Sequence, residues 1–382
     1  MYKVMTAGPV QVAQNVREAR SLECTNPDLD KDFFDFYRET CELFEMALHA
    51  TDHQALILGG EGILGLEAAC ASLTEPGDRV LVIDNGIFGE GFKDFVSMYG
   101  GEPVLYTTDY RKPVDPAGLE AFLKEDSAFK YATVVHCDTP SGVLNDVETI
   151  SRILAAHGIL SVVDSVAGMF GEPLDLSNAS IDILCGGSQK ALSAPPGLTM
   201  LWVSEKAYAS MEARKTPIAA FYANILMYRN YYENMLFPYT MPISDIMGLR
   251  QALDNFFEQN ATIYDRHRVI ASACRKAVTE AGLELYLESG SSNTVTVVNI
   301  PDGITDEELR GELMSKHGII ISGSYGCLAG KVVRIGHMGE NCYEDKVSEV
   351  LEAMQEVLEA HGISLKCNMA EIFDAALTEE LA

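Results

Sequence analysis

The chain of 382 residues is long enough for about two domains, and 47% of its residues are hydrophobic, which suits a large buried core. Its net charge of −28 repels nucleic-acid phosphates and anionic lipids, so we expect neither nucleic acid nor a membrane as a partner. The nine cysteines form no C-x-x-C pair, and we find no signal peptide and no run of about 18 apolar residues, which predicts a reduced, cytoplasmic protein.

Seven short apolar segments alternate with helical patterns between residues 55 and 205. Runs of this kind are typical of a mainly parallel sheet that is covered by helices on both faces. They predict an α/β domain with a seven-stranded, mainly parallel sheet. The expected strands are Ala55–Leu58, Arg79–Ile83, Pro103–Tyr106, Tyr131–His136, Leu160–Asp164, Ile181–Cys185 and Leu198–Val203.

The C-terminal third follows a different pattern, which indicates a smaller α+β domain. A long helical stretch from about Asp245 to Ala281 opens it, and Thr305-Asp306-Glu307-Glu308 is a capping box that predicts the start of another helix. Further strands are expected at Thr294–Ile300, Gly318–Ser322 and Val332–Gly336, and a closing helix at Tyr343–His361. We therefore expect an N-terminal segment lining the active site (1–14), a large cofactor-binding domain (15–250), a small domain (251–363) and an acidic tail (364–382).

Asp164 is the last residue of one predicted apolar strand, and Lys190 follows the end of another. A lysine between a buried strand and a proline-rich turn is in an unusual place for a solvated charge, although most lysines lie on surface loops. Ligands of open parallel sheets bind at the carboxyl ends of the strands, where Asp164 would point, although it could also cap the next helix. Together the two residues suit pyridoxal 5′-phosphate (PLP), whose ring nitrogen a carboxylate keeps protonated while a lysine forms a Schiff base.

A glycine-rich turn links the first predicted strand to a helix. Gly60, Gly62 and Gly65 spell G-x-G-x-x-G, and Asp84 closes the next strand. A helix N-terminus approached through glycines binds phosphate. The turn therefore predicts a phosphate site without choosing between PLP and a dinucleotide, and a tight turn without any ligand is a third alternative.

Three blocks resemble the class V aminotransferases of PLP fold type I, in particular the alanine–glyoxylate and serine–pyruvate aminotransferases. The blocks are residues 187–197, Asp164-Ser165-Val166 and Asn85-Gly86-Ile87-Phe88-Gly89, and the resemblance runs in order from Thr6 to about His361. It implies a homodimeric PLP enzyme. The enzyme would transfer an amino group from a small amino acid, such as alanine or serine, to a small 2-keto acid, such as glyoxylate or pyruvate.

The resemblance also implies roles around the cofactor ring. Lys190 matches the Schiff-base lysine, and Asp164 matches the partner of the ring nitrogen. Val166 would pack under the ring, and Phe88 would stack on its other face. Thr139 would lie near the phenolic oxygen of the ring.

At the phosphate end, the matching positions are Glu61, Gly62 and Ile63 in the turn and Gln189 before the lysine. Thr240 matches a residue that would reach across the dimer interface to the neighbouring subunit's phosphate. Glu61, however, occurs where the family commonly has a small hydroxyl residue. An acid beside a phosphate is unfavourable unless it turns away or finds a cation.

For the substrate, the resemblance implies that Arg334 binds the α-carboxylate with its planar fork and that Gly8 lines the same pocket. The structural alternative for Arg334 is an ion pair with a nearby acid such as Glu340. No metal site is expected, because His49 and His53 have no third ligand near them in the sequence.

Two rival functions remain. Cys327 resembles the mobile cysteine of class V desulfurases, which makes a PLP lyase the first rival, although those enzymes place a histidine directly before the lysine, where this chain has Gln189. A nicotinamide-dependent dehydrogenase that uses the Gly60–Gly65 turn is the second rival.

Overall fold

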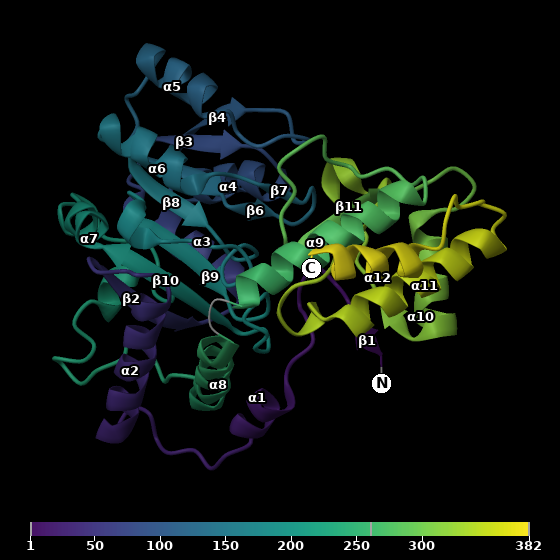
Figure 1. The fold of residues 1–382 in the computed structure, drawn as a ribbon. Coiled ribbons are helices and arrows are strands. Elements are labelled where there is room, and N and C mark those ends of the chain that lie inside the picture. Colours follow the sequence, from purple (N-terminus) through teal and green to yellow (C-terminus); the bar gives the residue numbers. More distant parts are fainter. Residues whose placement is uncertain (1, 260–261, 381–382) are drawn as a thin grey trace.

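A computed structural model describes residues 2–259 and 262–380 of the chain. Figure 1 shows an α/β layer domain beside a smaller domain that is built mainly from the C-terminal third of the chain. The predicted fold class, with a central seven-stranded sheet and a smaller α+β part, is confirmed. No helix within the described ranges is long and apolar enough to cross a membrane.

The large sheet has the strand order β2-β10-β9-β8-β5-β3-β4. β10 runs antiparallel to both of its neighbours, β2 and β9, and the remaining pairs in this sheet are parallel. All seven expected strands form. Their bounds are β2 (His53–Gly59), β3 (Arg79–Asp84), β4 (Glu102–Thr107), β5 (Tyr131–Val135), β8 (Leu160–Asp164), β9 (Ile183–Gly187) and β10 (Leu198–Ser204).

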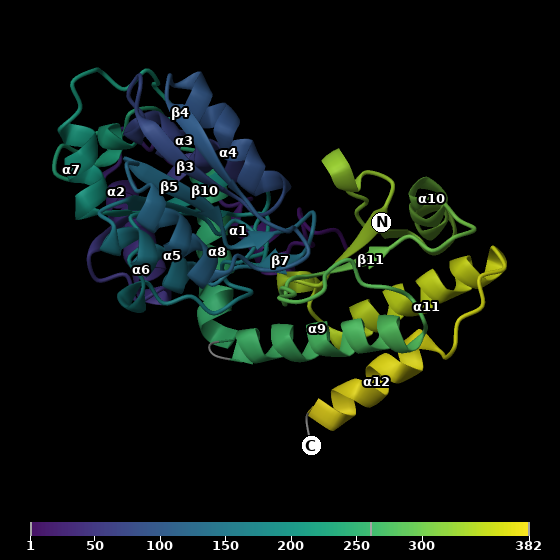
Figure 2. The ribbon, with the colours of Figure 1, turned by 90° about the horizontal axis from the view of Figure 1, so that it is seen from above.

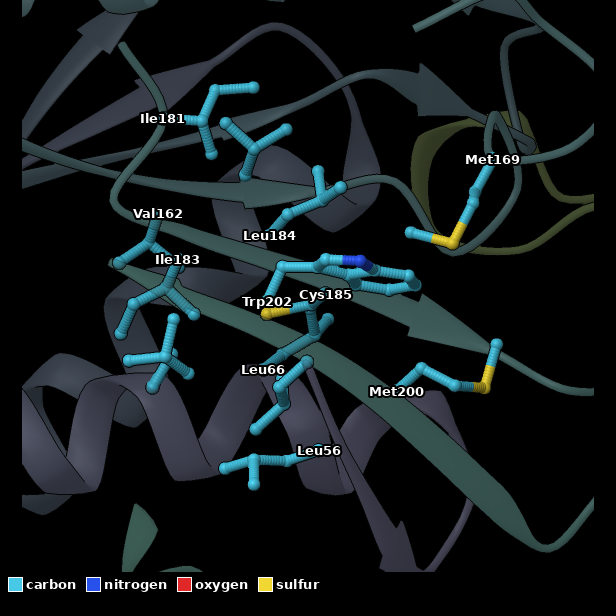
Figure 3. Packing of buried hydrophobic residues seen from close by; sticks show 14 of the residues in the cluster. Leu56, Leu66, Val162, Met169, Ile181, Ile183, Leu184, Cys185, Met200 and Trp202 are labelled. Atoms are coloured by element: carbon cyan, nitrogen blue, oxygen red, sulfur yellow. The ribbon is translucent and has the colours of Figure 1, made fainter. Parts of the chain in front are cut away.

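Helices cover both faces of this sheet. On one face, α3 packs so closely that a Cβ at Gly65 would collide with Thr199 of β10. On the other face, Trp202 of β10 lies among buried side chains (Figure 3), and its indole nitrogen donates to the Phe44 carbonyl of α2 over 3.1 Å. The helices are α1 (Gln14–Ala19), α2 (Lys31–Ala47), α3 (Gly62–Leu73), α4 (Ile87–Met98), α5 (Pro116–Glu125), α6 (Val147–Ala156), α7 (Glu205–Glu212) and α8 (Ile243–Gln259).

The small domain joins short strand pairs to a helical layer. β11 pairs antiparallel with β13, and β1 at the start of the chain pairs in parallel with β12. The predicted capping box at Thr305 is present at the start of α10. The elements are β1 (Lys3–Val4), α9 (Thr262–Glu280), β11 (Val295–Asn299), α10 (Asp306–His317), β12 (Ile319–Ile320), β13 (Val332–Gly336), α11 (Glu344–Ala360) and α12 (Met369–Glu380).

The first and last described segments, around β1 and α12, both pack into the small domain. Figure 2 shows α12 beside α9 and α11, and its Phe373 and Leu377 are buried in the core of that domain. These residues lie within the segment expected as a tail. The boundary expected after residue 250 falls within α8, whose Phe256 belongs to the core of the large domain. β1 thus belongs to the small domain, although the chain continues from it into the large domain.

Two small strands and four 3-10 turns complete the loops around the sheet. Their bounds are β6 (Cys137–Asp138), β7 (Val143–Leu144), η1 (Leu176–Asn178), η2 (Ile225–Tyr228), η3 (Gly326–Leu328) and η4 (Gly339–Asn341).

Candidate active site

The carboxyl ends of β8 and β9 bring Asp164 and Lys190 to the same cavity. The two strands pair in parallel with Asp164 opposite Cys185, and the chain leaves β9 through Ser188 and Gln189. The cavity has a volume of about 350 Å³ and a mainly apolar lining. Ten of the twelve predicted site residues line it: Gly8, Glu61, Gly62, Ile63, Phe88, Thr139, Asp164, Val166, Gln189 and Lys190.

The amine of Lys190 is held by the N-terminal segment. Its Nζ donates a hydrogen bond of 2.6 Å to the carbonyl oxygen of Ala7. Burial of the amine, followed by the positive charge of Arg334, lowers the Lys190 pKa to about 8. Gly8 permits this contact, because a Cβ there would collide with Nζ and its φ of +101° is unfavourable for other residues. Sequence reasoning missed Ala7, since a backbone carbonyl leaves no residue-type signal.

Asp164 contributes a buried carboxyl group to the cavity. Burial raises its pKa to about 7, against the opposing effects of a 2.9 Å hydrogen bond from the Val166 N–H and of the nearby Lys190. A cation placed against this carboxyl would favour its charged form and lower that pKa. The protonated nitrogen of a pyridine ring is such a cation, so the residue fits the predicted role.

Val166 and Phe88 line the cavity from different elements. A Cβ at Gly62 would approach Val166 Cγ2 to 2.8 Å, so glycine lets the start of α3 pack against this side chain. On α4, the Phe88 N–H donates to Asp138 Oδ1 over 3.0 Å. Asp138 thereby caps a helix whose own N-cap, Gly86, has no side chain. We did not predict that Asp138 caps α4. The one signal for it in the sequence was that Asp138 lies next to Thr139, in a loop already expected at the site.

The Phe88 ring also meets the small domain. Its centroid lies 5.8 Å from that of Tyr325, and the rings are 73° apart, an edge-to-face contact. The sequence did not single out Tyr325 for this contact, which joins residues distant along the chain.

Arg334 lies close to the cavity without lining it. It is 8% exposed, its Nε donates to the Gly323 carbonyl over 2.6 Å, and its guanidinium carbon is 5.6 Å from the Tyr325 ring centroid. Burial lowers its pKa. Within residues 2–259 and 262–380, no carboxylate forms an ion pair with Arg334. Asp306 is paired with Arg310 instead, over 2.9 Å at its second oxygen.

The structural alternative for Arg334 was an ion pair with a nearby acid such as Glu340, and no such pair forms in the described residues. Glu340 forms hydrogen bonds through its backbone: its N–H donates to the Ser193 hydroxyl, and its carbonyl accepts from Lys346. The Arg334 guanidinium is therefore a buried cation without a carboxylate in the described chain, and a substrate carboxylate would supply one.

The phosphate end of the cavity holds a carboxylate. Glu61 is the N-cap of α3, where its Oε1 accepts from the Ile63 N–H at 3.1 Å and its Oε2 accepts from Gln189 Nε2 at 2.8 Å. The predicted site residues therefore fit the ring of PLP but not its phosphate, because two expected phosphate donors already bind Glu61.

Thr240 does not reach the cavity of its own chain. Its hydroxyl donates to Asp28 Oδ2 over 2.8 Å, while the neighbouring Tyr239 hydroxyl accepts from the Gly59 N–H at 3.0 Å. The segment thus lies beside the end of β2, near the glycine-rich turn.

Comparisons with known proteins identify the family of the chain. The sequence model of the family Aminotransferase class-V matches residues 9–348. A pyridoxamine–pyruvate transaminase of Mesorhizobium japonicum is 33% identical, over 94% of this chain and 92% of that protein. An alanine–glyoxylate aminotransferase of Callithrix jacchus is 30% identical, over 92% and 86%. The crystal structure of a ureidoglycine–glyoxylate aminotransferase from Bacillus subtilis has a TM-score of 0.95 at 29% identity, covering 100% of this chain and 98% of that one. The resemblance predicted from the sequence is confirmed, and the chain belongs to the class V aminotransferases.

Proposed function

We propose that the cavity around Lys190 transfers an amino group from an amine donor to a small 2-keto acid on a vitamin B6 ring. The observation that carries the proposal is the buried amine and the buried carboxyl group at adjacent strand ends. The names of similar proteins pair pyridoxamine, alanine or ureidoglycine with pyruvate or glyoxylate, which supports a small keto acid.

Each residue of the cavity has a physical task in this reaction. Lys190 and Asp164 would hold the ring at its aldehyde carbon and its nitrogen, and Val166 and Phe88 would hold its faces. The bound ring supplies a sink for the electron pair that the reacting carbon keeps when it loses its proton. The Lys190 amine, neutral in a large fraction near pH 8, can take up that proton at Nζ and return it.

Arg334 completes the substrate side. Its planar guanidinium can bind both oxygens of a carboxylate, and the apolar surroundings strengthen that contact. Because it also lowers the pKa of Lys190, the same charge that would bind the keto acid helps to keep the amine neutral.

The proposed assembly is a homodimer in which Thr240 reaches the Glu61 end of the neighbouring cavity. In support, the segments around Thr240 expose large apolar side chains. Phe221 is 56% exposed, Tyr222 55% and Leu236 67%. Grouped apolar side chains on a protein surface favour contact with another protein.

The two rival functions gain no support from the site. Cys327, the cysteine on which the lyase alternative rests, is exposed on η3 and does not line the cavity. A dinucleotide phosphate at the Gly60–Gly65 turn would face the same Glu61 carboxylate as the phosphate of PLP.

Lys190→Ala tests the proposed function directly. Because the variant lacks the amine that holds the ring and moves the proton, amino transfer to pyruvate or glyoxylate should fall by at least about 10²- to 10⁴-fold. Chromatographic measurement of the amino-acid product checks this. The exposed Lys206→Ala is the matched control and should be unaffected. Near-normal turnover in Lys190→Ala would refute the proposal.

The reactivity of Lys190 should depend on pH with a midpoint near 8, because only the neutral amine reacts with an aldehyde. Reductive methylation with formaldehyde, quantified by peptide mass spectrometry, measures this as pH rises. Arg334→Ala should move the midpoint upward, since a nearby positive charge is removed. A midpoint near the ordinary lysine value of about 10.4 in the wild type would contradict the argument.

Arg334→Lys keeps the charge but loses the fork, and Arg334→Ala loses both. Loss of a bidentate, charge-assisted contact should lower kcat/KM for keto acids by about 30- to 1000-fold, or about 2–4 kcal/mol. Steady-state kinetics with pyruvate and glyoxylate measures the effect, and the exposed Lys331→Ala is the control. Unchanged kcat/KM, or unfolding of the small domain, would make Arg334 a structural residue.

Thr240→Ala should weaken binding of the ring without changing the dimer, because its hydroxyl would act across the interface. Analytical ultracentrifugation gives the assembly state, and absorbance titration with pyridoxal gives the affinity. Thr378→Ala, at an exposed threonine of α12, serves as the control. Full activity in a species that sediments as a monomer would exclude a site completed by the partner.

A further inference from the structure

Two side chains at the Glu61 end of the cavity, Glu61 and Gln189, present hydrogen-bond acceptors. Glu61 already binds the Ile63 N–H and the Gln189 amide, which leaves its carboxylate as an acceptor that lines the cavity. Gln189 is only 6% exposed, and its Oε1 is buried without a donor among the described residues. A ligand group that satisfies these two side chains must therefore be able to donate a hydrogen bond.

A phosphate ester does not meet that requirement. Near neutral pH it carries a charge of about −1.5 to −2 and its oxygens chiefly accept hydrogen bonds. A hydroxyl group both donates and accepts, so it can bind a carboxylate without repulsion. The chemistry of this end thus favours a hydroxymethyl group over its phosphate ester.

Charge leads to the same conclusion. Glu61 has no ion-pair partner in residues 2–259 and 262–380, and Lys190 is the only basic residue among those found to line the cavity. Lys190 has its own hydrogen bond to Ala7. A phosphate at the start of α3 would face an unneutralised carboxylate, and the net charge of −28 adds a repulsive field.

We infer that the cavity takes vitamin B6 in its phosphate-free form, with pyridoxamine as the amino donor and pyridoxal as the product. This inference rests on the proposed amino transfer at Lys190. Without a phosphate contact, the ring binds as a substrate that enters and leaves, rather than as a resident cofactor.

The reaction balances with a 2-keto acid alone. The aminomethyl carbon of pyridoxamine loses its amino nitrogen and one hydrogen and becomes an aldehyde, while the keto carbon gains an amino group and a hydrogen. One carbon is oxidised by two electrons and the other is reduced by two. The keto oxygen leaves as water, and a second water supplies the aldehyde oxygen.

Absorbance titration of the full-length protein with pyridoxal and with PLP tests this. The wild type should bind pyridoxal at least about tenfold more tightly, and mass spectrometry of the purified protein should find no retained PLP. Glu61→Gln, which removes the charge, should shift the ratio of dissociation constants toward PLP by about tenfold or more. Glu102→Gln, at an exposed position on β4, removes an equal charge and should leave the ratio unchanged.

Tighter binding of PLP by the wild type, or an unchanged ratio in Glu61→Gln, would overturn the inference while leaving amino transfer intact. Capture of neither compound would overturn the proposed function as well. The wild-type ratio decides the matter even if the variant fails to fold.

Discussion

The site depends on the burial of one amine. An ammonium group loses most of its hydration inside a protein, so burial favours the neutral amine and lowers its pKa. The positive charge of Arg334 lowers the pKa of Lys190 further. The Ala7 carbonyl accepts from the amine, and Gly8 leaves room for it. Because β1 pairs with β12, the segment that positions Lys190 is attached to the small domain. Both domains therefore contribute to the position of the reactive amine.

Charges of opposite sign lie at and near the cavity. Arg334, which is close to the cavity and contacts the Tyr325 ring, offers a cation to a carboxylate, whereas the start of α3 presents the Glu61 carboxylate. Ligands with an anionic group near Arg334 and a neutral hydroxyl near Glu61 match both charges. This asymmetry would orient the keto acid and the ring with respect to Lys190, and it would discriminate against a ligand that carries a phosphate at the α3 end.

Much of this arrangement could be predicted from the sequence, because local patterns carry it. Apolar runs predicted the strands, and the positions of Asp164 and Lys190 at the ends of predicted strands indicated that they meet at one edge of the sheet. The missed contacts are those that join distant segments. Ala7 acts through its backbone, and Tyr325 meets Phe88 only after the domains pack. The orientation of Glu61 could not be predicted either, since the sequence allowed its side chain to turn away from the cavity.

Chemical trapping of the ring on the full-length protein tests the central role of Lys190 most directly. Pyridoxal or PLP is added, borohydride reduces the covalent adduct, and peptide mapping by mass spectrometry locates the pyridoxyl group. We expect the label on the peptide that contains Lys190, at close to one group per chain, and no comparable label on exposed Lys206. A label chiefly on another lysine, or none under conditions in which the protein transfers amino groups, would contradict the assignment of this cavity as the active site.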